Sequence, residues 1–174
     1  MIRAEDAASL SRQATRMRGW APQGRPPGGA ADPGRATTPC SGTLNLRTGA
    51  ESVLQAEKLN AQTTAEPLEQ LLKAPPDVGI LLRWDRAPWQ RGEAIREGLA
   101  ANPRLEIVPL PVAAPDVNPQ AHVWKATREA VSPNHTDRQL ATLAGRFKAH
   151  LEATTFPTSC LEHRGFYTIH PRSI

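Results

Sequence analysis

An aspartate that follows a short apolar run is the residue of this chain best placed to do chemistry. Residues 78–82, VGILL, are typical of a strand buried on both faces, and Asp85 comes just after them. Binding sites of open α/β sheets gather at the carboxyl ends of such strands, where a carboxylate faces a crevice. Carboxylate oxygens are ligands that Mg²⁺ prefers, so Asp85 could hold a divalent ion there. The plainer interpretation is that Asp85 only caps the loop that follows.

The elements around Asp85 can be predicted from the spacing of the apolar residues. The second half of the chain alternates short apolar runs with helical patterns, which indicates parallel strands joined by crossover helices. An alternating pattern on both sides of Thr48-Gly49 indicates an antiparallel hairpin upstream. The predicted fold class is therefore α/β. Strands are predicted within 37–57, 78–82 and 105–110, and helices over 63–73, 91–101, a segment that starts near Pro119, and 138–153.

The composition suits one domain and favours contact with phosphate without proving it. The chain has 174 residues, a formal net charge of +4 and a pI near 9.6. A solvated basic surface explains this charge equally well. No run approaches the roughly 20 apolar residues of a membrane span, and the N-terminus lacks the apolar region of a secretory signal, so we expect no membrane contact and a cytoplasmic location. Cys40 and Cys160 are far apart and form no redox or zinc motif.

A longer motif points to a known family. It lies within 109–125, PLPVAAPDVNPQAHVWK, and its matching residues are Pro115, Asp116, Asn118, Pro119, His122, Val123, Trp124 and Lys125. This segment resembles the last active-site segment of bacterial insertion-sequence transposases of the mariner superfamily, which are DDE endonucleases. The resemblance spans residues 6–170 and is strongest in 78–135. It implies an RNase H-like fold, in which a mixed sheet is flanked by helices.

The resemblance assigns roles to particular residues. Asp85 matches the family's second metal-binding aspartate. Asp6 falls at the place of the first one, counted back from the W-A-P-x-G turn at 20–24. Such enzymes cleave and transfer DNA strands with two Mg²⁺ or Mn²⁺ ions, which three carboxylates hold. The third position, a glutamate in the family, is Ala121 here, which predicts a degenerate and catalytically impaired transposase domain.

No nearby residue is an evident substitute for the third carboxylate. Glu129 lies eight residues after position 121, about 12 Å along a helix. Asp116 accompanies the glutamate in the family and is better suited to cap the helix, while His122 points about 100° away around the helix axis. The chain departs from the family at two further positions, with Ala7 in place of a glutamate and Gln90 in place of a histidine.

Three segments are expected along the chain. Residues 1–36, with many Pro and Gly, are expected to be a poorly ordered N-terminal segment that contains a remnant of the first strand. Residues 37–155 are expected to form the RNase H-like DDE domain, and 156–174 an irregular C-terminal tail. Relatives carry a helix-turn-helix region upstream that this sequence does not include, so the resemblance implies an N-terminally truncated protein.

DNA is the partner that the resemblance implies. Without a helix-turn-helix, its binding should be weak, directed at the DNA backbone and sensitive to salt. The basic residues near the predicted active site are candidates for this contact, although they could equally be plain surface charges: Arg86, Arg91, Lys125 and Arg128. Trp84, Trp89 and Trp124 could stack on bases, although Trp124 fits a packed core better. A homodimer is compatible with the sequence.

Two other functions stay open at this point. The chain could be a non-enzymatic transposon remnant or an adopted module that binds DNA or a partner protein. It could also be a different RNase H-like nuclease whose third acid comes from elsewhere. For the activity of the chain, Ala121 favours the non-enzymatic module. For its ancestry, the motif in 109–125 favours a transposase.

Overall fold

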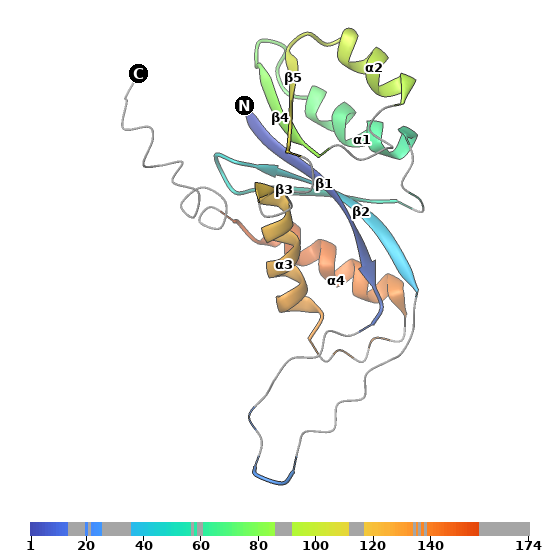
Figure 1. The fold of residues 1–174 in the computed structure, drawn as a ribbon, viewed down its shortest axis with the longest axis vertical. Coiled ribbons are helices and arrows are strands. Elements are labelled where there is room, and N and C mark those ends of the chain that lie inside the picture. The colour runs from blue at the N-terminus through green and yellow to red at the C-terminus, as the bar shows by residue number, and fades with distance from the viewer. Residues whose placement is uncertain are drawn as a thin grey trace, which may run out of the picture.

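The chain folds into a twisted sheet with helices on both faces (Figure 1). The computed structural model describes residues 1–13, 20, 22–25, 36–56, 58, 61–85, 92–111, 117–133, 135, 137 and 139–156. Within them the elements follow the order β1 (Ile2–Ser11), β2 (Thr37–Asn45), β3 (Glu51–Gln55), α1 (Ala61–Leu72), β4 (Ile80–Trp84), α2 (Glu93–Ala100), β5 (Leu105–Pro109), α3 (Pro119–Val131) and α4 (Leu140–Ala153).

The sheet is mixed, as predicted, with the spatial order β3-β2-β1-β4-β5. β1 pairs antiparallel with β2 and parallel with β4, and β4 pairs parallel with β5. The predicted hairpin is present, since β2 and β3 are antiparallel neighbours and Gly49 between them has a positive φ of 72°. Glycine adopts this left-handed conformation without the steric cost that a side chain adds.

β1 is longer and more central than the sequence suggested. We expected only a remnant of this strand and a loop from residue 7 onward, but β1 runs to Ser11 and lies between β2 and β4. Glu5 and Asp6 interrupt its apolar pattern, which is why the period-2 signal was weak. Backbone hydrogen bonds on both edges stabilise the strand instead. β2 pairs with β1 from Arg3 to Ser11, and β4 pairs with it from Ile2 to Glu5.

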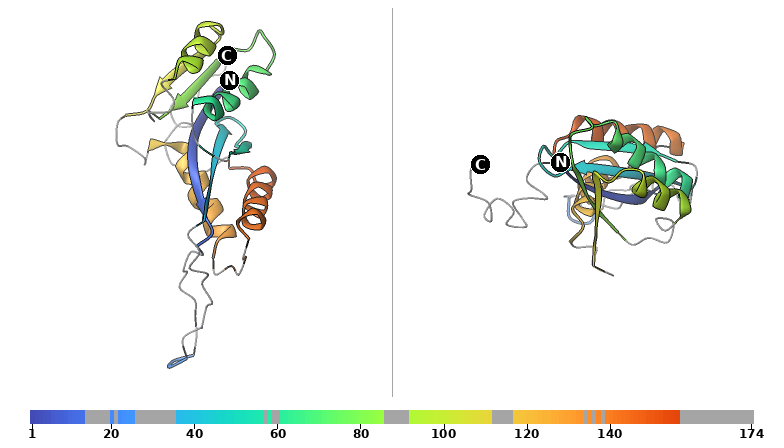
Figure 2. Two further views of the ribbon diagram at one scale, coloured as in Figure 1. Left: turned by 90° about the vertical axis from the view of Figure 1, so that its right-hand side faces the viewer. Right: turned by 90° about the horizontal axis from the view of Figure 1, so that it is seen from above.

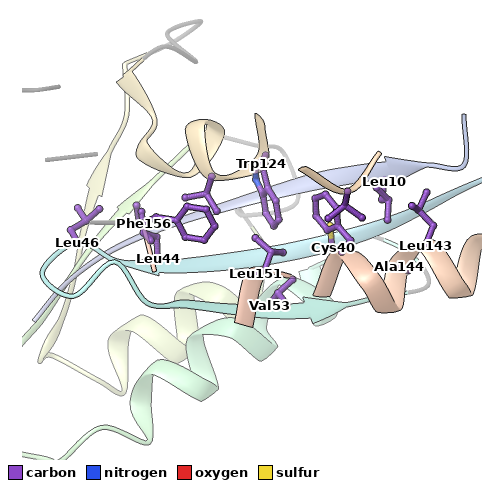
Figure 3. Close-up of a cluster of buried hydrophobic side chains, with 14 residues drawn as sticks. Leu10, Cys40, Leu44, Leu46, Val53, Trp124, Leu143, Ala144, Leu151 and Phe156 are labelled. Atoms are coloured by element: carbon purple, nitrogen blue, oxygen red, sulfur yellow. The ribbon is translucent and has the colours of Figure 1, made fainter. Parts of the chain in front are cut away.

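Two hydrophobic clusters fill the two faces of the sheet. On one face, α3 and α4 pack against β1, β2 and β3 (Figure 3). The indole of Trp124 stacks there on Phe147, with ring centroids 6.0 Å apart. On the other face, α1 and α2 pack over β4 and β5 (Figure 2). Leu71, Leu82 and Ile95 belong to the cluster between them. Phe156, which the sequence placed in an irregular tail, is buried in the first cluster. Residues 157–174 lie outside the described part of the chain.

None of the described helices has the length and apolar character required to cross a bilayer. The longest, α4, has 14 residues. A span of the hydrocarbon core needs roughly 20 mostly apolar residues.

Candidate active site

Asp6 and Asp85 meet on neighbouring parallel strands. β1 and β4 pair in register from Ile2 with Leu81 to Glu5 with Trp84, and the next residue is an aspartate on both segments, Asp6 within β1 and Asp85 directly after the end of β4. Neighbouring strands lie roughly 4.8 Å apart, and residues level with each other point to the same face. Asp6 shares that face with Ala4 and Leu10, which belong to the cluster under α3 and α4. The structure therefore brings together the two carboxylates that the sequence identified.

The charge of Asp6 is destabilised by this position. Burial raises the pKa of Asp6 most, and the nearby carboxylate of Asp85 raises it further, to about 6. The Ala7 backbone N–H, the indole N–H of Trp124 and the charge of Arg128 act in the opposite direction. The indole nitrogen is nevertheless buried without a partner at full hydrogen-bond geometry among the described residues. A cation between the two aspartates would relieve their repulsion, and their hard oxygen donors suit Mg²⁺ or Mn²⁺.

Replacing Asp85 with Asn tests this geometry without any metal. The substitution keeps the shape of the side chain and removes the like charge, so the pKa of Asp6 should fall below its value of about 6. It should stay above the ordinary value of 3.8, because burial is the larger cause of the shift. Carbon-detected NMR titration of the Asp6 carboxyl measures this, with Asp77→Asn on an exposed turn as the matched control. An Asp6 pKa that is unchanged in Asp85→Asn would show that the two carboxylates do not meet.

Helix α3 carries position 121 on the face that points toward Asp6. The helix begins beside the carboxyl ends of β4 and β5 and runs along β1 (Figures 1 and 2). Its N-cap is Asn118, whose side chain accepts a hydrogen bond from the Gln120 backbone N–H, and Pro119 opens the first turn. Ala121 lies one turn before Trp124 and two turns before Arg128, and both of these side chains lower the pKa of Asp6. Side chains at these spacings share one helix face, so residue 121 belongs to the face that addresses Asp6.

A buried polar contact holds the first turn of α3 on the sheet. The sequence analysis did not predict it. The Gln120 side-chain amide donates a 2.8 Å hydrogen bond to Glu51 Oε1 on β3. Both side chains are buried, with 0% and 8% exposure, and the contact passes directly over Gly42. Gly42 pairs with Asp6 across β1 and β2. A glycine inside a strand often marks such a close approach, and this was the signal in the sequence that could have revealed the contact.

Glu5, next to Asp6, faces the opposite side of the sheet. Its side chain is 2% exposed and accepts a 2.6 Å hydrogen bond from the Ser41 hydroxyl. Burial is the main reason why the pKa of Glu5 rises to about 8, so this carboxyl is largely protonated at neutral pH. Among the described residues, no three His, Cys, Asp or Glu side chains are grouped so that they could hold a metal ion. Glu5 therefore does not replace the carboxylate that is missing at position 121.

The structure describes only some of the other residues that the sequence analysis singled out. Lys125 and Arg128 are exposed on α3, and Arg128 also donates a 3.4 Å hydrogen bond to the Ser9 carbonyl. The stacking role considered for tryptophans is wrong for Trp84 as well as Trp124, because both side chains are buried at 3% exposure. The remaining candidates lie outside the described residues: Arg86, Trp89, Gln90, Arg91 and Asp116. The described N-cap of α3 is Asn118 rather than Asp116.

Comparison with known proteins decides the family. The sequence profile described as "DDE superfamily endonuclease" matches residues 2–144, which is most of the chain. The chain belongs to the DDE superfamily endonucleases. No curated protein sequence matches it.

Solved structures show that this DDE domain has the RNase H-like fold of a transposase. It is similar to the Mos1 transposase in a paired-end complex with the left transposon end, with a TM-score of 0.70 and 18% identity. That match covers 97% of this chain and 52% of the Mos1 chain, so the DDE domain spans about half the length of that transposase. It is also similar to the catalytic domain of Mos1 mariner transposase, with a TM-score of 0.61, 14% identity, and coverage of 97% and 76%.

Proposed function

We propose that this DDE domain is a transposase catalytic domain that binds a divalent metal ion through Asp6 and Asp85 and is impaired in DNA cleavage. The observation that carries the proposal is the register of β1 and β4, which sets the two aspartates level beside the helix face that bears Ala121. A pair of carboxylates is sufficient to hold one ion together with water molecules. The third carboxylate, which the resemblance places at position 121, is absent.

Mg²⁺ or Mn²⁺ is the proposed cofactor. Mos1 paired-end complexes have been solved with Mg and with Mn, which supports the use of either ion here. When bound, such an ion would activate a water molecule or a 3′-hydroxyl and stabilise the leaving oxygen. The protein's own contribution is positional. β1 and β4 fix the two aspartates, and the indole N–H of Trp124 faces Asp6 and favours its ionised form.

We further propose that DNA reaches this site along α3. Lys125 and Arg128 are exposed on this helix and can neutralise backbone phosphates beside Asp6. Arg86 and Arg91 stay proposed contacts from the sequence. The Mos1 complex with a transposon end supports DNA as the partner. Contacts of this kind position the backbone without reading sequence, so binding should be weak and salt-sensitive.

A second candidate is a non-enzymatic module of the same family that binds DNA or a partner protein. The observation that favours it is that the described residues contain no group of three metal-binding side chains. The two candidates differ in metal binding, because the module needs no ion to contact DNA.

Titration with Mn²⁺ followed by electron paramagnetic resonance tests the proposed function. The wild-type domain should bind Mn²⁺, and Asp6→Asn should weaken that binding by at least about 10–100-fold, the range seen even for outer partners of metal ligands. Asp77→Asn, the same chemical change on an exposed turn, should leave it unaltered. If Asp6→Asn bound Mn²⁺ as well as the wild type, or if neither bound it while DNA binding persisted, the non-enzymatic module would be the better account.

A further inference from the structure

A cleft on the other face of the sheet has no part in the proposed metal site. It lies between the second half of α1 and the strands β1, β2 and β3, and its volume is about 430 Å³. Its wall residues are Met1, Arg3, Thr43, Ser52, Pro67, Gln70, Leu71, Lys73, Ala74 and Pro75. Side chains alternate between faces along a strand, so Arg3 and Asp6 on β1 point to opposite sides of the sheet. A ligand in this cleft would therefore be separated from Asp6 and Asp85 by the thickness of the sheet.

The charges around the cleft favour an anion. Arg3 and Lys73 line it, and none of the described residues that line it is acidic. The Nε atom of Arg3 is buried and has no hydrogen-bond partner among the described residues. Burial lowers the pKa of this guanidinium, and the charge of Glu51 acts in the opposite direction. The Arg3 side chain is partly buried, and an anionic ligand would offset the cost of removing part of its charge from water.

The uncharged groups of the cleft also suit an anion. Thr43 and Ser52 are direct cross-strand partners on β2 and β3 and both line the cleft, so two neighbouring residues offer it hydroxyl groups. The carbonyl end of α1 does not oppose an anion, because Arg104 donates hydrogen bonds to the carbonyls of Leu72, Ala74 and Pro75. This guanidinium satisfies the carbonyl groups that give a helix end its partial negative charge.

We propose that this cleft binds one nucleotide unit, with its phosphate held by Arg3 and Lys73 and its base lying against the apolar wall formed by Leu71 and Pro67. Guanidinium and ammonium groups are the usual protein partners of phosphate oxygens. A volume of about 430 Å³ falls in the range of small-molecule sites and exceeds what a bare phosphate needs. The nucleotide could belong to a DNA strand that passes behind the sheet, or it could be a free nucleoside phosphate.

Binding of thymidine monophosphate and of a five-residue oligothymidylate, followed by NMR of the backbone amides, tests the proposal and separates the two sources. At least the oligonucleotide should shift the amide signals of Thr43 and Ser52. Lys73→Glu should weaken binding about tenfold or more, because it removes a charge-assisted contact and adds a repulsive charge. Lys148→Glu, the same charge reversal on α4 across the sheet, should leave binding unchanged. Binding of both probes indicates a site for a free nucleotide unit, and binding of the oligonucleotide alone indicates a DNA strand.

The same titration can overturn the proposal in two ways. The first is that neither probe shifts the amide signals of Thr43 and Ser52 at millimolar concentration. The second is that Lys148→Glu weakens binding as much as Lys73→Glu, which would indicate diffuse charge attraction. Arg3→Gln provides a second variant inside the cleft, and circular dichroism confirms that each variant is folded. Asp6→Asn should leave nucleotide binding intact, so failure of the metal site and failure of this cleft would be told apart.

Discussion

Replacing Ala121 with Glu should raise Mn²⁺-dependent nicking of supercoiled DNA by at least about 10–100-fold over the wild-type domain. The new carboxylate would stand on the face of α3 that carries Trp124 and Arg128, both of which act on Asp6. It would complete a set of three acids, which is what a pair of divalent ions requires. Ala121 is only partly buried, so a longer side chain can enter without repacking the core. Conversion of supercoiled to open-circular plasmid measures the effect.

Two controls separate chemistry from folding in this experiment. Ala121→Gln adds a side chain of nearly the same size as Glu without the charge, so its nicking should stay at the level of the wild type. The double variant Ala121→Glu with Asp6→Asn should lose the gain, because both carboxylates serve one site. Equal nicking by the Glu and Gln variants, or nicking that survives the loss of Asp6, would contradict the proposed arrangement of the three positions.

Replacing Gly42 with Ala should destabilise the domain by about 3 kcal/mol, which lowers the melting temperature of a domain of this size by about 6–12 °C. An added Cβ would lie 2.4 Å from Gln120 Nε2, 2.5 Å from Glu51 Oε1 and 2.6 Å from Trp124 Cη2. These distances are too short for non-bonded atoms, so α3 must move or the Gln120–Glu51 hydrogen bond must break. Breaking that bond leaves buried polar groups without partners.

Thermal unfolding followed by circular dichroism measures this loss, with Gly145→Ala as the matched control. Gly145 lies inside α4, and a Cβ there meets no atom within 4 Å. Alanine is the better helix former by about 1 kcal/mol, so this variant should be slightly more stable than the wild type. If Gly42→Ala unfolded at the wild-type temperature, the close packing of α3 on β2 would be wrong.

The regular part of the fold could be predicted from local pattern. The apolar runs that became β4 and β5 and the helical spacing of α4 required no tertiary information, because burial on a face repeats at a fixed period. The full length of β1 was not predicted, because its two acidic residues, Glu5 and Asp6, break that period. The pairing of the strand on both edges, a non-local property, stabilises it in the centre of the sheet.

For the candidate site too, single residues could be predicted from the sequence, whereas their contacts could not. Asp85 could be found from its place at a strand end, and Asp6 from a family motif, but their meeting depends on the register between β1 and β4. The Gln120–Glu51 contact joins residues 69 positions apart and could not be read from local spacing. The burial of Trp84 beneath α1 and α2 likewise depends on which face of β4 the helices cover.

The number of Mn²⁺ ions bound per chain in the wild type and in Ala121→Glu is the most direct test of the proposed site. Isothermal titration calorimetry should give one ion for the wild type, held by Asp6 and Asp85, and two for the variant. Two ions in the wild type would mean that a third ligand already exists elsewhere. A single ion in both proteins would mean that residue 121 does not face the two aspartates.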